Sequence, residues 1–194
     1  MDRDYEPLAI RELGAGASFR RPTQTQAVRV TPDSSALQVM TDLARVSPAT
    51  IRPQAPLAGA NQFMITRGVR LLLVVDEHDT ILGLITATDL LGERPMQVAT
   101  PRGLRRDELG VADVMTPAAQ IEVLALADVE AARVGHVLET LRRLGRQHAL
   151  VVDARNTVCG IFSISQIARQ LGVTVASGGE VARTFSQIEA ALGR

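Results

Sequence analysis

The stretch LLLVVDEHDTILGLITATDLL, residues 71–91, decides the fold. Its first five residues are aliphatic, too few for a buried helix and typical of a strand. The polar DEHD segment at residues 76–79 favours a turn, and residues 81–85 form a second aliphatic run, so the sequence predicts a β-hairpin. After it, Thr86, Thr88 and Asp89 either cap the helix that begins there or face a ligand.

The same pattern returns about 77 residues later. LVVD at residues 150–153 repeats LVVD at residues 73–76, and Gly145 and Gly160 repeat Gly68 and Gly83. The triplet VMT occurs at residues 39–41 and again at residues 114–116. Turn and glycine positions that recur at one offset indicate two copies of one supersecondary unit. Because a lone copy cannot cover its apolar face, we expect the two repeats to pack as one pseudo-two-fold body.

The N-terminal half also predicts shorter elements. Residues 27–30 are expected to form a short strand. TPDS at residues 31–34 predicts the start of an amphipathic helix, with Leu37, Met40, Leu43 and Val46 on its apolar face. A strand is expected at residues 49–52, before Pro53. A second helix is expected at residues 57–66, ending at Gly68.

The boundaries follow from these elements. We expect an N-terminal extension at residues 1–36, a first repeat at 37–92, a Gly-, Pro- and charge-rich linker at 93–110, and a second repeat at 111–171. Residues 172–194 carry Val181, Phe185, Ile188 and Leu192 at helical spacing. This spacing predicts an amphipathic helix that docks on the module or on a second subunit.

Composition excludes several classes of function. Lys+Arg and Asp+Glu number 21 each, so no net charge would attract nucleic acid or an acidic membrane. Aromatic residues make up 3%, without Trp, which disfavours base stacking on single strands. The N-terminus has no apolar leader, and no apolar run approaches the roughly 20 residues of a membrane span. We therefore expect a cytoplasmic protein that binds neither nucleic acid nor membrane.

The chain offers no obvious catalytic or metal centre. Cys159 is alone, and with His78, His136 and His148 it gives too few ligands at the wrong spacing for zinc or a catalytic triad. GAGA at residues 14–17 has Phe19 where a dinucleotide loop needs its third glycine. Two arginine groups are expected to be solvated, although each could meet a phosphate: Arg102, Arg105 and Arg106, and Arg142, Arg143 and Arg146.

Each repeat ends in one frame, a glycine in the return strand followed by a hydroxyl and then a polar residue at steps of three. The frame is Gly83, Thr86 and Asp89 in the first copy, and Gly160, Ser163 and Gln166 in the second. With the LVVD strand and VADVMTP at residues 111–117, it resembles a stand-alone tandem pair of cystathionine β-synthase (CBS) domains, a Bateman module. The resemblance implies an α/β fold of two β-α-β-β-α units with mixed sheets packed face to face.

The resemblance also implies clefts for an adenosine compound such as AMP, ADP, ATP or S-adenosylmethionine. An aspartate at the position of Asp89 would accept hydrogen bonds from both ribose hydroxyls, since a carboxylate has two acceptor oxygens. The first site would comprise Thr50, Ile51, Pro53, Val69, Arg70, Leu72, Thr86, Thr88 and Asp89. A weaker second site, which lacks the carboxylate, would comprise Arg146, His148, Ser163 and Gln166.

These observations predict a regulatory binding protein, not an enzyme, that senses an adenosine ligand mainly at the first site and signals to a partner protein. The alternative is a structural or oligomerisation module whose sites have degenerated, with Asp89 only a helix cap. We also expect a homodimer, because the Phe185 face of the tail would leave apolar surface to cover.

Overall fold

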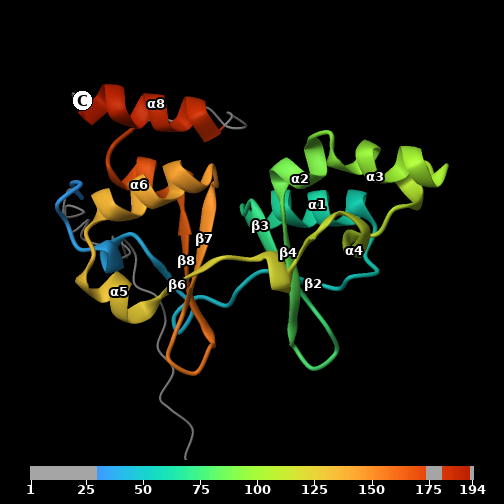
Figure 1. Cartoon of the computed structure of the whole chain (residues 1–194), viewed down its shortest axis with the longest axis horizontal. Helices are drawn as coiled ribbons and strands as arrows, with labels where there is room; N and C mark the ends of the chain where they lie inside the picture. Colours follow the sequence, from blue (N-terminus) through green and yellow to red (C-terminus); the bar gives the residue numbers. More distant parts are fainter. Residues whose placement is uncertain (1–29, 174–180, 193–194) are drawn as a thin grey trace, which may run out of the picture.

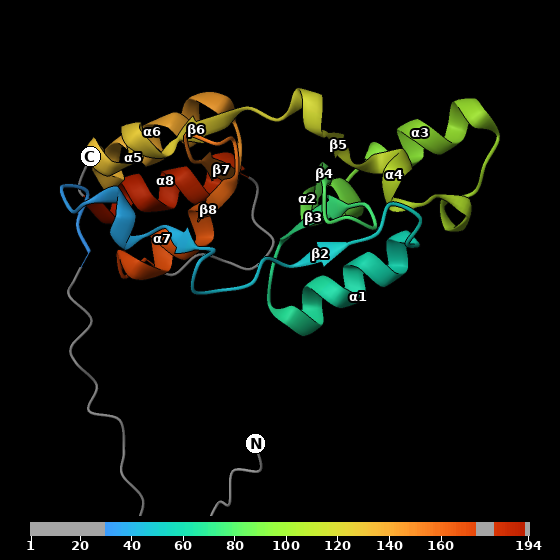
Figure 2. The same cartoon turned by 90° about the horizontal axis from the view of Figure 1, so that it is seen from below.

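The computed structural model describes residues 30–173 and 181–192. Within them, two four-stranded mixed sheets face each other, each with helices on its outer side (Figures 1 and 2). The mixed α/β class and the two-repeat organisation predicted from the sequence are confirmed. Of the strand expected at residues 27–30, only Val30 lies among the described residues, and it is not in a strand.

The predicted hairpin is present in both repeats. In the first, β3 (Leu71–Val75) pairs antiparallel with β4 (Ile81–Thr86). The Asp76 carboxylate holds the turn by accepting from the backbone N–H of His78 at 2.9 Å and of Thr80 at 2.8 Å. Asp153 makes the matching pair of contacts in the second repeat. The aspartate of LVVD is therefore repeated because it builds the turn.

The first repeat adds three elements to its hairpin. β2 (Thr50–Ile51) lies parallel to β3, as expected from residues 49–52. α1 (Leu57–Arg67) ends at Gly68, whose φ of 65° is the left-handed conformation that glycine adopts without strain. α2 (Ala87–Leu91) follows β4 directly. Leu72 and Val74 of β3 are fully buried against these two helices.

The second repeat has the same order of elements, with one additional helix, α5 (Leu126–Ala131). β6 (Val123–Ala125) is followed by α5 and α6 (Val134–Leu144). The hairpin of β7 (His148–Val152) and β8 (Val158–Ser163) then leads into α7 (Ile164–Gln170). Between the sheets, Leu71, Leu73 and Val75 of the first repeat pack with Leu150 of the second. This apolar layer joins the two repeats.

Each sheet takes its fourth strand from the N-terminal part of the other repeat. β1 (Thr41–Asp42) pairs with β8, and β5 (Thr116–Pro117) pairs with β4. The repeated VMT triplet leads into both strands, so its recurrence reflects this exchange. In Figure 2 the blue N-terminal segment accordingly lies beside β8, while β5 lies by the first sheet.

The exchange also explains the repeated glycines. A Cβ on Gly83 would collide with the backbone carbonyl of Thr116, and a Cβ on Gly160 would collide with the Met40 side chain. Only glycine therefore allows the borrowed segment to lie this close to the return strand.

The prediction of an amphipathic helix after residues 31–34 is wrong. The chain forms only a short 3₁₀ turn, η1 (Ala36–Gln38), before entering β1. Leu37 and Val46, assigned to the apolar face, are 42% and 55% exposed. Strand pairing across the repeats overrides the local helical spacing, because Thr41 and Asp42 complete the second sheet opposite Ile161 and Gly160.

The segment expected to be a linker, residues 93–110, contains ordered structure. α3 (Arg94–Arg102) and η2 (Arg106–Glu108) lie there, and α4 (Val111–Val114) and η3 (Ala118–Gln120) follow. Ala99, Leu109, Val111 and Val114 are buried in the core of the first repeat. The polar composition of the segment gave no sign of these helices, because only its few apolar residues pack into the core.

The predicted C-terminal helix is confirmed as α8 (Val181–Leu192). It lies on the outer helices of the second repeat (Figure 1), where Phe185 and Ile188 are 6% and 2% exposed. The Phe185 face is therefore covered within the chain, which removes the reason given for a homodimer. Among the described residues, no helix is long and apolar enough to cross a membrane.

Candidate functional site

The frame at the end of the first hairpin forms a capping box. The Thr86 hydroxyl accepts from the backbone N–H of Asp89 at 3.2 Å. Asp89 Oδ2 in turn accepts from the Thr86 backbone N–H at 2.9 Å and from its hydroxyl at 2.7 Å. These bonds satisfy backbone donors at the start of α2. The capping role of Asp89 is therefore real.

The other oxygen of Asp89 contacts Arg94, a residue that sequence reasoning missed. Arg94 Nη1 donates to Asp89 Oδ1 at 3.0 Å and to the Thr116 hydroxyl at 3.2 Å, while Nη2 donates to the Met115 carbonyl at 2.9 Å. Three donors thus occupy the carboxylate. A carboxylate has about four lone-pair sites, so roughly one acceptor position remains for a ligand unless Arg94 moves.

Asp89 lies at a cavity between the repeats, which we call the Asp89 pocket, with a volume of about 290 Å³. The first repeat contributes the end of its hairpin and the start of α2. The second contributes residues 145–148, the segment that enters β7. The lining residues are Leu71, Leu84, Thr86, Thr88, Asp89, Thr116, Gly145, Arg146, Gln147 and His148.

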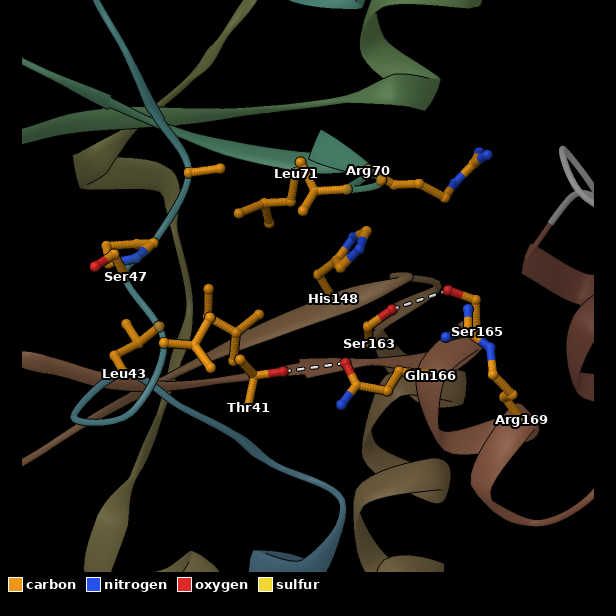
Figure 3. Close-up of a pocket in the computed structure, with 16 residues that line it drawn as sticks. Thr41, Leu43, Ser47, Arg70, Leu71, His148, Ser163, Ser165, Gln166 and Arg169 are labelled. Carbon is orange, nitrogen blue, oxygen red and sulfur yellow. Dashed lines mark hydrogen bonds between the residues drawn. The ribbon is translucent and has the colours of Figure 1, made fainter. Parts of the chain in front are cut away.

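A second cavity, the Gln166 pocket, is the pseudo-symmetric counterpart, with a volume of about 220 Å³ (Figure 3). Here the second repeat contributes Ser163, Ser165 and Gln166, and the first contributes residues 68–71, which enter β3. The loop at residues 43–49 adds apolar lining. The Thr41 hydroxyl donates to Gln166 Oε1 at 3.0 Å, and the Ser163 and Ser165 hydroxyls are hydrogen bonded to each other at 3.0 Å.

Leu71 and His148 line both pockets. They occupy equivalent positions, the first residues of β3 and β7. The Nδ1 atom of His148 is buried without a hydrogen-bond partner among the described residues. The pKa of His148 is lowered to about 4, mainly by burial and also by the charge of Arg70, while the charge of Asp89 opposes the shift. His148 is therefore neutral at pH 7.

The predicted site residues are brought together in a crossed arrangement. Val69 and Arg70, assigned to the first site, line the Gln166 pocket, whereas Arg146, assigned to the second, lines the Asp89 pocket. His148 belongs to both. Sequence reasoning assigned each strand to the cleft of its own repeat, but each cleft combines the hairpin end of one repeat with the strand entry of the other.

Four predicted contacts lie elsewhere. Thr50 and Ile51 line a shallow cavity beside α1 with Phe63, on the outer side of the first sheet. Leu72 is fully buried in the core of the first repeat. The carbonyl of Pro53 accepts from the backbone N–H of Ala112 at 2.9 Å. None of the four lines the Asp89 or the Gln166 pocket.

Most of the remaining candidate arginines have structural partners. Arg102 pairs with Asp113, Arg105 with Asp107 and Glu108, and Arg106 donates to the Leu90 carbonyl at 2.6 Å. Arg142 pairs with Glu139. Cys159 lies in β8, half-buried, where burial raises the pKa of its thiol. Within residues 30–173 and 181–192, no group of three or more His, Cys, Asp or Glu could hold a metal ion.

Two facing sheets, two exchanged strands and two pseudo-symmetric pockets define a paired α/β repeat module. Residues 36–95 match the family model of the CBS domain. The chain as a whole has the fold of CBS-pair structures to which it is similar. No curated protein sequence matches it.

Three solved structures illustrate the likeness. An uncharacterised conserved protein from Pyrococcus horikoshii has a TM-score of 0.56 at 19% identity, covering 77% of this chain and 100% of its own. The CBS-domain pair of protein MJ0100, in complex with 5′-methylthioadenosine and S-adenosyl-L-methionine, has a TM-score of 0.51 at 21% identity. The match covers 73% of this chain and 98% of that structure. CBSX2 of Arabidopsis thaliana, in complex with AMP, has a TM-score of 0.50 at 20% identity. The match covers 70% of this chain and 94% of that structure.

Proposed function

We propose that this protein is a regulatory module that binds an adenosine compound in the Asp89 pocket and signals the bound state to a partner protein. The observation that carries the proposal is the position of Asp89. Its side chain is 18% exposed and lies at a cavity walled by both repeats, with Thr86 and Thr88 beside it. A helix cap needs no cavity, so capping alone does not account for this placement.

The geometry of Asp89 limits how a ribose would bind. One acceptor position remains on the carboxylate, and the Thr88 hydroxyl lines the same pocket. We propose that one ribose hydroxyl donates to Asp89 directly. Binding of both hydroxyls would displace Arg94, which would keep its contacts with Met115 and Thr116.

Two solved CBS pairs support the choice of ligand class. MJ0100 was crystallised with 5′-methylthioadenosine and S-adenosyl-L-methionine, and CBSX2 with AMP. We propose AMP, ADP, ATP or S-adenosylmethionine for this chain, acting as a sensed ligand and not as a catalytic cofactor. Binding regulates a partner only if the ligand prefers one of two arrangements of the module, and we propose that a ligand in a pocket walled by both repeats favours the arrangement that closes the pocket.

The test compares two carboxylates that each accept from a backbone N–H at the start of a helix. Asp113 also accepts from the backbone N–H of the residue that caps its helix, Gly110, at 2.9 Å, and also pairs with an arginine, Arg102. It lines neither the Asp89 nor the Gln166 pocket. Asp89→Asn and Asp113→Asn should therefore lose similar stability, whereas only Asp89→Asn should lose ligand affinity.

Isothermal titration with AMP, ADP, ATP and S-adenosylmethionine measures the affinity. A hydrogen bond to a charged group contributes about 1.5 to 3 kcal/mol, so Asp89→Asn should weaken binding by about tenfold to a hundredfold. Because the chain has no Trp and one Tyr, a co-purified adenine compound would dominate its ultraviolet spectrum near ~260 nm. Equal affinity in the two variants would show that Asp89 is only a cap, and no binding of any compound would refute the sensor function.

A further inference from the structure

The two pockets are formed by equivalent positions of the two repeats but differ in charge. The Asp89 pocket is lined by one carboxylate and one guanidinium, Asp89 and Arg146. The Gln166 pocket is lined by two guanidiniums, Arg70 and Arg169, and by no Asp or Glu. At the repeat offset of 77, Gln147 stands at the position of Arg70 and Gly92 at that of Arg169. The shared fold therefore does not require these arginines.

The two guanidiniums also have no structural partner within the described part of the chain. Among the described residues, Arg70 and Arg169 have no ion pair and no side-chain hydrogen bond, whereas Arg146 of the Asp89 pocket pairs with Glu122 at 3.1 Å. Figure 3 shows Arg70 from the first repeat and Arg169 from the second on the side of the pocket that carries Ser163 and Ser165. Leu43 and Ser47 line the other side. One end of the pocket is therefore cationic and the rest is largely apolar.

The uncharged polar groups of this pocket are also suited to an anion. Oε1 of Gln166 already accepts from Thr41, which leaves the amide N–H groups as donors. Ser163 and Ser165 share one hydrogen bond, so one of the two hydroxyl protons remains free. Guanidinium, amide and hydroxyl donors together match the oxygens of a phosphate.

We infer that the Gln166 pocket selects ligands that carry a phosphate group, held by Arg70 and Arg169, and that the Asp89 pocket lacks this selectivity. The inference rests on the proposed adenosine-binding function and adds the charge class of the ligand at each pocket. It also reverses the expectation that replacing Asp by Gln only weakens the second site. Loss of the carboxylate removes the group that would repel an anion.

Binding of AMP and of adenosine to the full chain tests the inference. Titrations at low ionic strength should show AMP binding about tenfold to a hundredfold more tightly than adenosine at one of two sites, as expected for a charge-assisted contact. The double variant Arg70→Gln and Arg169→Gln should bring that ratio close to one, while the affinity of adenosine changes little. Arg70→Gln introduces the residue that the other repeat carries naturally, so the fold should tolerate it.

Arg155→Gln is the matched control, because Arg155 lies exposed in the turn of the second hairpin and lines neither pocket. It should keep the wild-type ratio of AMP affinity to adenosine affinity. An unchanged ratio in the double variant, or equal binding of AMP and adenosine by the wild type, would overturn the inference while leaving adenosine binding intact.

Titrations with inorganic phosphate and ribose 5-phosphate separate the anion site from adenosine binding. If they bind through the two arginines while adenosine does not bind at all, the anion pocket stands and the adenosine function fails; if no phosphate compound binds, the inference fails.

Discussion

Stability should fall as the pH is lowered from 6.5 towards 4, and His148 should be a main cause. Its pKa in the folded chain is about 4, against an ordinary value of 6.5. Between these two values the unfolded chain holds a proton on this histidine that the folded chain does not, so acid favours unfolding. The full difference corresponds to about 3 kcal/mol, of which about 2 kcal/mol is lost by pH 5.

His148→Leu isolates this contribution. Leucine is the residue at the equivalent position of the first repeat, Leu71, so it suits the layer between the sheets. It also removes Nδ1, the buried atom without a partner. The variant should be at least as stable as the wild type at pH 7.5 and should lose about 2 kcal/mol less on transfer to pH 5.

Urea unfolding followed by circular dichroism at pH 7.5, 6 and 5 measures the difference. Asp113 sets the background, because its contacts with Arg102 and Gly110 lower the pKa of its carboxyl and stabilise the fold until the pH falls below the ordinary range of an aspartate. The contribution of Asp113 is therefore retained between pH 7.5 and 5 and is the same in both proteins. Parallel pH dependences in wild type and His148→Leu would refute the lowered pKa of His148.

Two further predictions concern the strand exchange and the open face of the first repeat. Gly83→Ala should destabilise the chain by about 1 to 3 kcal/mol and more than Gly160→Ala in urea unfolding, because its new Cβ meets the Thr116 backbone, whereas Met40 can move; equal losses would contradict this. We also keep the prediction of a homodimer, now through α1 and α2: Leu91 is 63% exposed, while its repeat equivalent Ala168 is buried in the cluster that includes α8 residues. Light scattering should then give a dimer mass that Leu91→Asp lowers and Leu37→Asp does not; a monomer for the wild type would rule the dimer out.

Local and repeated signals predicted most of the fold. The hairpin of residues 71–86 depends on neighbouring residues, and its turn geometry recurs with Asp79 and Asn156 both near φ 60°. The repeat then predicted the second hairpin without further information. The strand β1 could not be predicted in this way, because its partner lies about 120 residues further along the chain and its two residues carry no strand pattern of their own.

Contacts between residues far apart in the sequence also limited the prediction of the site. The frame that contains Thr86 and Asp89 was recognisable, and the structure brings both to a cavity. Arg94 was missed because it lies in the segment expected to be a linker, although it contacts Asp89 directly. Arg169 carried no signal beyond its charge. The equivalence of residues 68–71 and 145–148 was visible at the offset of 77, but not the fact that each segment lines the pocket of the other repeat.

This crossed construction has a consequence for regulation. Each pocket is closed by a hairpin end from one repeat and a strand entry from the other, so neither pocket keeps its shape if the repeats move apart. Leu71 and His148 border both cavities, and the apolar layer of Leu73, Val75 and Leu150 lies beside them. We therefore expect a ligand that shifts either shared side chain to change the second pocket as well. If both pockets bind ligands as proposed, we expect coupling between them through this shared wall, and by linkage each ligand should change the affinity of the other by the same factor.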